Sequence, residues 1–416
     1  MRSTIFLTRH NVVAPALSLP EAAAAAVFGA ARTRGPIARD AVAQVTSLSI
    51  ATVNRQVTAL LDAGLLRERP DLAASGAIGR PRVPVEVNHE PYLTLGLHIG
   101  ARTTSIVATD LLGRTLDVVE TPTPRGSQNS ALAALAGSAS RYLSRWHRRR
   151  PLWVGVTAGG VVDSATGHVD HARLGWTDAP VGPVLAETLG LPVSLASHVD
   201  AMAGAELLLG ARRVSGSAAS NAASNTAPVT SLYVYARETV GYALSIGGRV
   251  HSPTSGPGTI AALPAQSEML GGSGQLESTV SDEAVLTAAR RLRIVPADGP
   301  SSTIGAVLRA ARQGDQTAVD LLGERAHVLG ESVALLRDML NPDDLVVGGQ
   351  AFTEYPEGMA EVEAAYARRS VLAPRDLRLT SFGNRIQEAG AGVVSLGGLY
   401  ADPIAAMRRA ARDKTA

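Results

Sequence analysis

Four polar side chains stand close together at positions 52–56: Thr52, Asn54, Arg55 and Gln56. The guanidinium group of arginine matches the edge of guanine, and the carboxamide of asparagine or glutamine matches the edge of adenine. This combination is suited to reading bases in the major groove of DNA. Two hydroxyl side chains, Ser47 and Ser49, precede the set, and we expect them to contact the DNA backbone or minor groove.

Two short helices are expected to position these side chains. Apolar residues at 38, 41, 42 and 45 have the spacing of one helix face, and those at 50, 53, 57, 60 and 61 form a second stripe. Ser49 is a suitable N-cap for the second helix, and Gly64 suits its C-terminal end. A polar turn at 46–48 joins the two, so the pattern predicts a helix-turn-helix. The alternative is a small helical bundle used only for docking.

The residues after Gly64 predict a two-stranded hairpin, formed by 65–69 and 83–87. It would complete a winged helix-turn-helix domain over residues 20–88, in which a first helix covers 21–33. The loop between the strands ends in Arg80 and Arg82, which suit a narrow minor groove or a row of phosphates. A solvated turn is the alternative for this loop. Residues 1–19 are expected to form a flexible arm.

Composition excludes several classes of protein. The chain has 416 residues, 45% hydrophobic and 18% charged, which is typical of folded domains with substantial cores. It contains no cysteine, which excludes disulfides, thiolate zinc sites and a cysteine nucleophile. Lys414 is the only lysine, so the Gly-Lys-Ser/Thr of a P-loop ATPase is excluded. Neither a secretory segment nor a bilayer-spanning apolar run is found, so we expect no membrane association and a cytoplasmic, nucleoid-associated protein.

The stretch from 93 to 416 alternates predicted strands with predicted helices. Strand pairs followed by strand–helix units occur twice, which predicts an α/β protein with two similar halves. Residues 93–107 alternate like a strand around Gly100, and one helix after Ala389 closes the chain. Glycine pairs at strand ends indicate a place where backbone approaches a ligand. The uncharged, low-complexity stretch 214–229 is expected to be a mobile inserted loop.

From about Ala24 onwards the chain resembles the ROK family of repressors and sugar kinases, and specifically its transcription regulators. The resemblance is carried, in order, by LSIATVNRQVTALLDAGLL with the GRPRV loop, LGLHIGARTTSIVATDLLGR, VGVTAGGVVDSATGHV, LGW at 174–176, LPVSLASHVDAMAGAELLLG, VGYALSIGGRV and NPDDLVVGGQ. It implies that a winged helix-turn-helix precedes a sugar-kinase-like domain over residues 93–416. That domain would have the actin-like ATPase fold in two similar lobes.

Residues that serve catalysis in the ROK kinases are replaced in this chain. The family's first phosphate loop, Asp-Ile-Gly-Gly-Thr, begins here with His98, and its Glu-Asn-Asp catalytic segment reads Ala196-Ser197-His198. Phosphoryl transfer without these carboxylates lacks its positioning groups. The comparison therefore implies no catalytic residue and no cofactor, with a regulatory sugar or amino-sugar kinase as the alternative.

The sugar and zinc contacts of the family are also replaced. Arg173 stands where the family has asparagine before Leu-Gly-Trp, and the family's Glu-Ile-Gly-His begins here with Thr259. The three zinc cysteines of the family fall on Glu268, Leu270 and Gln275, which do not form a tetrahedral zinc set, so no metal is expected.

These replacements suggest a changed ligand site. If His98, Arg173 and His198 converge, with Ser197 and Thr259 beside them, the site would bind an anionic effector, phosphorylated or carboxylated. The alternatives are a sugar-derived neutral effector and a decayed pocket in which the histidines only fill space.

The resemblance implies a sequence-specific transcription regulator of carbohydrate metabolism, and repression is the commoner mode in the family. Its partners would be double-stranded DNA with a pseudo-palindromic operator, a second copy of the chain in a homodimer or homotetramer, and a small-molecule effector. A structural scaffold with degenerate domains is a third hypothesis. The intact polar face that begins at Ser49 argues against it.

Overall fold

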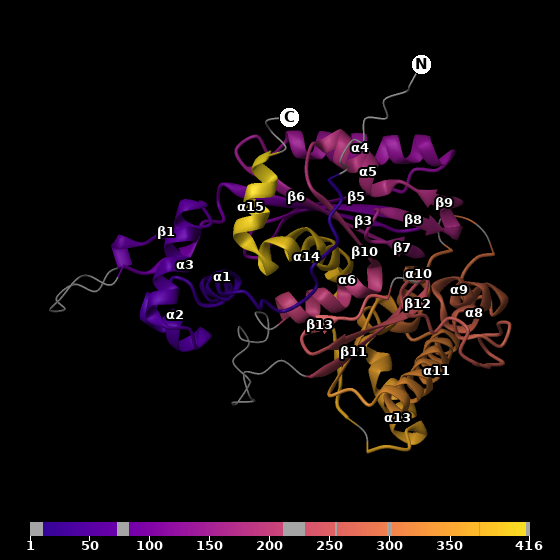
Figure 1. The fold of residues 1–416 in the computed structure, drawn as a ribbon. Helices are drawn as coiled ribbons and strands as arrows, with labels where there is room; N and C mark the ends of the chain where they lie inside the picture. The colour runs from indigo at the N-terminus through magenta and orange to yellow at the C-terminus, as the bar shows by residue number, and fades with distance from the viewer. Residues whose placement is uncertain are drawn as a thin grey trace. The chain divides into compact units, whose positions relative to one another are not determined.

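The computed structural model describes residues 11–72, 83–210, 229–253, 256–297, 299, 302–373 and 375–412. Its contacts divide the chain into two compact units. The first unit contains Met1–Gly216, Pro253–Gly256 and Gln387–Ala416, and the second contains Ser217–Ser252 and Pro257–Ile386. Their helices and strands are labelled in Figure 1. Among the described helices, none combines the length and the apolar character needed to cross a bilayer.

Three helices and a hairpin open the first unit, and we call them the N-terminal module. They are α1 (Ala23–Arg34), α2 (Arg39–Thr46), α3 (Ile50–Asp62), β1 (Leu66–Glu68), the short 3-10 helix η1 (Pro70–Leu72) and β2 (Val85–Val87). The strands pair antiparallel, with Leu66 opposite Val87. The helices enclose a small apolar core in which five side chains are at most 1% exposed: Phe28, Val42, Val53, Val57 and Leu60. These elements follow the order that the apolar spacing predicts.

Residues 11–19 pack against the first unit, so the prediction of a flexible arm is wrong for this stretch. The Asn11 carbonyl accepts a hydrogen bond from the Val193 amide at 2.9 Å, and the Val13 amide donates to the Val193 carbonyl at 2.8 Å. Val12 thereby pairs in parallel with the edge of a sheet. The prediction failed because the polar backbone groups of an edge strand accept any extended segment, whatever its side chains. Residues 1–10 lie outside the described part of the chain.

Glycines provide the surface on which this arm lies. The side chain of Val12 occupies space beside Gly167 and Gly182, where a Cβ atom would approach it to 3.0 Å. Leu17, only 6% exposed, packs in the same manner on Gly204. The absence of side chains at these three positions therefore creates a shallow apolar seat for residues 12–17.

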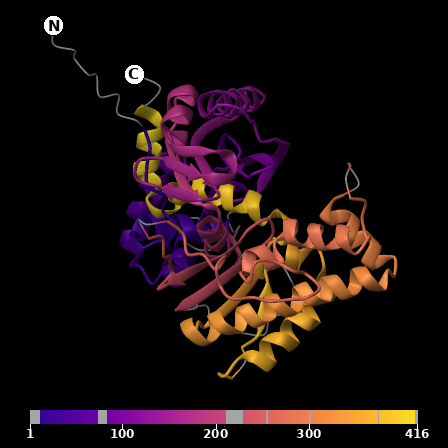
Figure 2. The same ribbon diagram turned by 90° about the vertical axis from the view of Figure 1, so that its right-hand side faces the viewer.

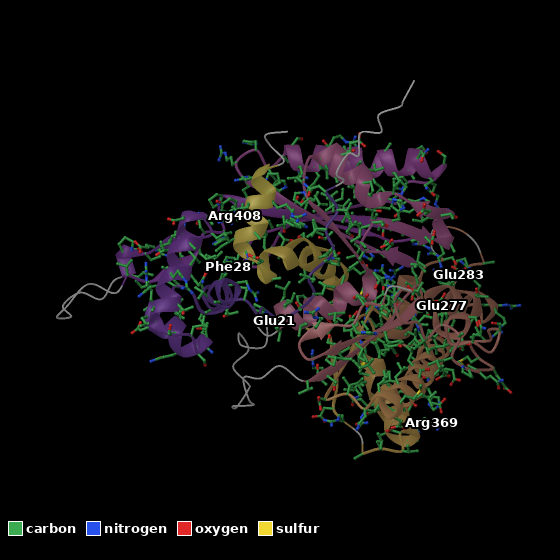
Figure 3. All side chains as sticks on the ribbon, in the orientation of Figure 1. Glu21, Phe28, Glu277, Glu283, Arg369 and Arg408 are labelled. Atoms are coloured by element: carbon green, nitrogen blue, oxygen red, sulfur yellow. The ribbon has the colours of Figure 1, made fainter. Side chains whose placement is uncertain are left out.

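Side chains of α1 join the N-terminal module to the rest of the first unit. The Arg32 guanidinium donates to the Leu208 carbonyl at 3.0 Å and lies over the ring of Tyr400, 4.3 Å from the ring centre. Phe28 also faces Tyr400, with ring centres 6.3 Å apart. Figure 3 labels Phe28 on α1 and Arg408 on α15 (Pro403–Arg412), the helix that contacts both α1 and α3. These contacts combine apolar packing with a cation–π interaction.

A five-stranded sheet forms the centre of the first unit, in the order β10-β6-β3-β4-β5. Its strands are β3 (Tyr92–Ile99), β4 (Thr103–Thr109), β5 (Thr115–Pro122), β6 (Arg150–Ala158) and β10 (Val193–Ser197). The first three form an antiparallel meander, and β6 and β10 run parallel to β3. The single strand expected at 93–107 is therefore a hairpin, because the chain reverses at 100–102. One face of the sheet packs against α4 (Gln128–Ser144) and α5 (Val181–Leu189).

The other face of this sheet is covered by α14 (Ile386–Ala401), which returns from the end of the chain. A Cβ atom at Gly155 would lie 2.2 Å from the Ser395 nitrogen, and one at Gly96 would lie 2.8 Å from the Ala391 carbonyl carbon. Only glycine allows the helix backbone this close to the sheet. The expected single closing helix is two helices, because Pro403 begins α15.

A small sheet and several short helical segments complete the first unit. A three-stranded sheet consists of β7 (Val161–Asp163), β8 (His168–His171) and β9 (Trp176–Ala179), with the 3-10 helix η2 (Ala172–Leu174) between the last two strands. The sequence analysis did not predict these short strands. Helix α6 (His198–Ala205) follows β10 directly and continues into a single π-helical turn, η3 (Glu206–Gly210).

The second unit has a sheet of the same design. Its strands are β11 (Thr230–Ala236), β12 (Val240–Ile246), β13 (Arg249–Val250), β14 (Asp344–Gly348) and β15 (Leu377–Leu379), in the order β13-β12-β11-β14-β15. A three-stranded antiparallel meander is again followed by two parallel strands. The prediction of two similar halves is therefore confirmed. Of the loop predicted at 214–229, only Val229 lies within the described residues.

The helices of the second unit are α8 (Leu276–Val280), α9 (Asp282–Arg291), α10 (Ile304–Arg312), α11 (Gln316–Leu340), α12 (Gln350–Thr353) and α13 (Met359–Arg369), with 3-10 turns η4 (Pro356–Gly358) and η5 (Gly383–Arg385). Figure 2 shows α11 and α13 side by side, and Gly330 permits their close contact. Buried Arg325 links α11 to two other elements, donating to Asp282 at 2.7 Å and to the Val280 carbonyl at 2.8 Å.

We expect the substitution Leu17→Asp to release the arm, because a carboxylate loses hydration in this apolar seat. The amides of Val13 and Val193 should then exchange with solvent about tenfold faster or more, which corresponds to a loss of ~1.4 kcal/mol of local stability. Hydrogen exchange measured by mass spectrometry or NMR tests this. Leu72→Asp is the matched control, since Leu72 is 48% exposed. Unchanged exchange at Val193 in the Leu17 variant would contradict the docking.

Candidate functional site

Helix α3 turns one face to the core and the other to solvent. Val53, Val57 and Leu60 are fully buried, whereas Asn54 and Arg55 are exposed. Thr52 and Gln56 lie at the boundary between the two faces, partly buried. The four residues selected from the sequence as base readers thus lie on or beside one solvent-facing surface, which we call the α3 surface.

The turn before α3 is built by the two serines. Ser47 has a left-handed backbone with φ of 56°, which turns the chain sharply between α2 and α3. The hydroxyl of Ser49 accepts a hydrogen bond from the Thr52 amide at 3.2 Å and caps the helix, as the sequence predicts. Both serines are exposed. They lie at the N-terminal end of α3, where the free amides favour a phosphate.

Asn54 is held by a neighbour that the sequence analysis did not identify. Arg39, the first residue of α2, donates to the Asn54 side-chain oxygen at 3.5 Å and forms an ion pair with Glu68 at 3.1 Å. A bidentate contact of Asn54 with adenine uses both the oxygen and the nitrogen of its side chain. The long hydrogen bond from Arg39 must therefore break when Asn54 binds adenine. No sequence pattern signals the contact, because Arg39 and Asn54 are fifteen positions apart.

Arg55 differs from the arginines of the hairpin. Within the described part of the chain it has no hydrogen-bond or ion-pair partner, and its side chain is exposed. Arg67 and Arg69 instead contact Glu86 at 2.7 Å and 3.0 Å. Hydrogen bonds from Arg67 lower the pKa of Glu90, which confirms that these hairpin charges are paired internally. Arg55 is therefore the cationic residue of α3, and its side chain is exposed.

Two exposed apolar side chains border the α3 surface. Ile50, the first residue of α3, is 50% exposed, and Val45 at the end of α2 is 39% exposed. The sequence analysis assigned both to the core stripe, because periodicity alone does not locate the boundary of a core. Exposed methyl groups beside base-reading residues suit contact with the methyl group of thymine. Arg80 and Arg82, the predicted loop contacts, lie outside the described residues.

A second set of candidate residues gathers where the parallel strands of the first unit end. Ile99, Ala158 and Ser197 lie side by side at the carboxyl ends of β3, β6 and β10. His98 is the penultimate residue of β3, and His198 follows Ser197 as the first residue of α6. Carboxyl ends of adjacent parallel strands are the usual ligand site of α/β sheets. We call this region the sheet-end site.

The structure brings His98 and His198 together, which meets for these two residues the condition set by the hypothesis of a changed ligand site. Their ring centres are 6.5 Å apart in an edge-to-face arrangement. His98 is 6% exposed, and its Nδ1 lies 3.0 Å from the Thr157 hydroxyl. The Nδ1 atom of His198 lies 3.4 Å from the Ala158 carbonyl oxygen. The hydroxyl of Ser197 accepts from the Asp200 amide at 3.2 Å, so this candidate ligand residue is the N-cap of α6.

A third histidine, His171, belongs to the sheet-end site and was missed in the sequence. It ends β8, is 6% exposed, and its ring meets Trp176 edge-to-face at 6.4 Å. A Cβ atom at Gly159 would lie 3.3 Å from Nε2 of His171 and 3.7 Å from Nδ1 of His198. The two rings therefore converge beside the same glycine. The one sequence signal for His171 is its position two residues before Arg173, which the sequence analysis did select.

Burial favours the neutral form of His171 and His198. It is the main cause that lowers the pKa of His198 to about 4, and the neighbouring His171 contributes in the same direction. Burial also lowers the pKa of His171, and the Arg173 charge acts in the same direction. Arg173 itself is exposed on η2. Thr259 belongs to the second unit, is exposed, and accepts a hydrogen bond from the Ala261 amide at 3.2 Å.

The two five-stranded sheets of the same design, together with the sheet-end site, define an actin-like sugar-kinase fold. The model of the ROK family matches residues 94–392, so the chain belongs to the ROK family, and within it to the transcriptional regulators. It is 71% identical over 409 residues to the transcriptional regulator Rv0485 of Mycobacterium tuberculosis, covering 97% of this chain and 91% of the relative.

More distant relatives agree with this assignment. The DNA-binding transcriptional dual regulator NagC of Escherichia coli is 23% identical over 345 residues, which cover 78% of this chain and 80% of NagC. A crystal structure of a ROK family transcriptional regulator, a homologue of the E. coli Mlc protein, has a TM-score of 0.74, 22% identity and coverage of 94% and 98% of the two chains. A ROK glucokinase from Streptomyces griseus has a TM-score of 0.61, 21% identity and coverage of 73% and 99%. These structural matches show the shared fold.

The depressed pKa of His198 predicts a pH dependence of stability. An unfolded histidine gains its proton near pH 6.5, whereas the folded ring stays neutral until about pH 4. Protons therefore favour the unfolded state within this window, and stability falls as the pH falls through it. The loss amounts to about 3 kcal/mol at most.

Denaturant unfolding at a series of pH values, compared between the wild type and His198→Asn, measures this contribution. The wild type should lose stability more steeply than the variant between pH 6.5 and pH 4. His147→Asn is the matched control, because His147 is exposed. Parallel pH profiles for wild type and His198→Asn would show that the ring is not held neutral.

Proposed function

We propose that the N-terminal module is a winged helix-turn-helix domain that binds a specific DNA sequence through the α3 surface. The observation that carries this proposal is the combination on α3 of a buried apolar stripe with an exposed Asn54 and an unpaired Arg55. Thr52 and Gln56 flank them and complete the base-reading set. Ser47 and Ser49 supply contacts to the DNA backbone, and the hairpin of β1 and β2 acts as the wing, with Arg80 and Arg82 on its loop.

The regulator acts as a repressor on a pseudo-palindromic operator. A homodimer or homotetramer presents two copies of α3 to the two half-sites, since a two-fold operator mirrors two-fold protein symmetry. Relatives that are 23% identical bear the name N-acetylglucosamine repressor, which supports repression as the mode of action. A cytoplasmic, nucleoid-associated location follows from this role.

The ROK domain senses a small-molecule effector and does not phosphorylate it. The strand ends that hold carboxylates in the family's kinases hold His98 and His198 here, and burial keeps His198 neutral and uncharged. A neutral imidazole neither holds a magnesium phosphate in place nor replaces two carboxylates. The name of the N-acetylglucosamine repressors supports a sugar-derived effector, and the sheet-end site is where we place it.

The substitution Arg55→Ala should weaken specific DNA binding by about tenfold to a hundredfold, which corresponds to the ~1–3 kcal/mol of a bidentate contact with guanine. Binding is measured by gel shift or fluorescence anisotropy with an operator selected from random DNA or from the promoter of the protein's own gene. Low salt favours detection, because phosphate contacts are then strongest.

Arg148→Ala is the matched control, since it removes the same charge from an exposed position outside the N-terminal module. It should leave the specific affinity unchanged. Equal losses of specific DNA affinity in Arg55→Ala and Arg148→Ala would show that Arg55 contributes only its charge. Selection that yields no preferred sequence would contradict the proposed function itself.

A coupled assay tests the absence of kinase activity. We expect no ATP-dependent phosphorylation of glucose, N-acetylglucosamine or N-acetylmannosamine above the rate without protein, because the positioning carboxylates are missing. Activity that co-purifies with the protein and is abolished by His198→Ala would reinstate the kinase alternative.

A further inference from the structure

We propose that the sheet-end site binds an anionic group of a small molecule, with His98, His171 and His198 as the residues that recognise it and take up protons as it binds. The role of this anionic ligand as an effector of regulation rests on the proposed function. The site itself, and its test, are independent of DNA binding.

The fold places the three rings at one point. His98 and His198 come from the carboxyl ends of β3 and β10, which flank β6 on either side. His171 comes from the small sheet, whose strand β7 begins three residues after β6 ends. Three separate backbone segments therefore deliver one imidazole each to the end of β6, which is the usual position of a ligand in a parallel sheet.

Glycines bring the backbone of the adjoining turns close to the rings. The Cβ position of Gly159 lies 3.3 Å from Nε2 of His171 and 3.7 Å from Nδ1 of His198, and the Cβ position of Gly100 lies 3.7 Å from Nε2 of His98. The turns that follow β3 and β6 thus lie directly against the rings, where a side chain would meet them. The imidazole N–H groups beside these turns are donors suited to phosphate or carboxylate oxygens.

The charges that act on the rings favour an anion. The charge of Arg173 on η2 lowers the pKa of His171, and His171 lowers the pKa of His198. Arg102 lies in the turn after β3 and is exposed. The carboxylates on β7, β8, β9 and α6 are Asp163, Asp170, Asp178 and Asp200.

Two of these carboxylates already serve the protein's own backbone. Asp163 accepts from Ala165 and Thr166, and Asp170 accepts from the Asp178 amide. Asp200 is buried in the first turn of α6. The rings do not combine with them into a metal site, because no group of three or more such side chains within the described ranges has a metal-binding arrangement.

Protonation links ligand binding to pH. In the free protein burial favours the neutral form of His171 and His198, and a buried anion stabilises the charged imidazolium form. The complex therefore binds protons that the free protein does not, and affinity rises as the pH falls. A decayed pocket would show neither the affinity nor the linkage, and a site for a neutral sugar would show affinity without linkage.

Isothermal titration calorimetry with inorganic phosphate, glucose 6-phosphate, glucuronate and glucose tests the proposal. We expect the anions to bind and glucose not to bind, with an anion affinity that falls about tenfold for each pH unit between about pH 5.5 and pH 7.5 when one proton is taken up. Buffers with different ionisation enthalpies should give heats that differ by the number of protons absorbed. The sugar phosphate and the sugar acid distinguish the two sources of negative charge.

The variants His171→Asn and His198→Asn should each weaken anion binding at least about tenfold and reduce the proton uptake. His168→Asn is the matched control on the same strand as His171, since His168 pairs with Asp178 at 2.6 Å and should behave as wild type. A single cooperative unfolding transition at pH 7.5, followed by circular dichroism, shows that each variant is folded. Anion affinity that is independent of pH, equal affinity for glucose, or no binding of any anion at millimolar concentration would overturn the proposal.

Discussion

The edge strand β10 carries the docked N-terminal arm at its first residue and the sheet-end site at its last residue. All five of its residues are buried, and it pairs in parallel with β6 on one side. At its first residue, Val193, the free side of the strand is closed by the backbone of residues 11–13. At its last residue, Ser197, it caps α6 and places His198 in the sheet-end site. The arm and the sheet-end site therefore occupy the two ends of one buried strand of five residues.

A second physical connection leads from the sheet-end site to the N-terminal module. Helix α6 begins at His198 and runs into the π turn η3, where the Leu208 carbonyl accepts the hydrogen bond from Arg32 of α1. π turns disturb the regular ladder of helical hydrogen bonds and recur at functional sites. The arm approaches the same helix from the other direction, through the contact of Leu17 with Gly204. Both routes end at α1, which packs on α3, the helix that we propose reads DNA.

The sequence predicted well those features that depend on local spacing. The apolar stripe of α3, the Ser49 cap and the glycine turns follow from side-chain periodicity and from backbone preferences, which act over a few residues. The docked arm, the contact of Arg39 with Asn54 and the inclusion of His171 depend on segments far apart in the chain. Their side chains carry no pattern, because a backbone hydrogen bond to an edge strand or an imidazole at a strand end is specified by tertiary position alone.

The architecture explains how a kinase-type domain changes its ligand site without losing its fold. The position of α14 on the sheet is fixed by Gly96 and Gly155, and the core beneath α4 and α5 is apolar. Neither contribution involves the polar residues at the strand ends, so the side chains at positions 98 and 198 can differ among related proteins without altering these two contacts. A site lined by imidazoles differs chemically from one lined by carboxylates, because a carboxylate needs a cation between itself and a phosphate, whereas a protonated imidazole contacts an anion directly.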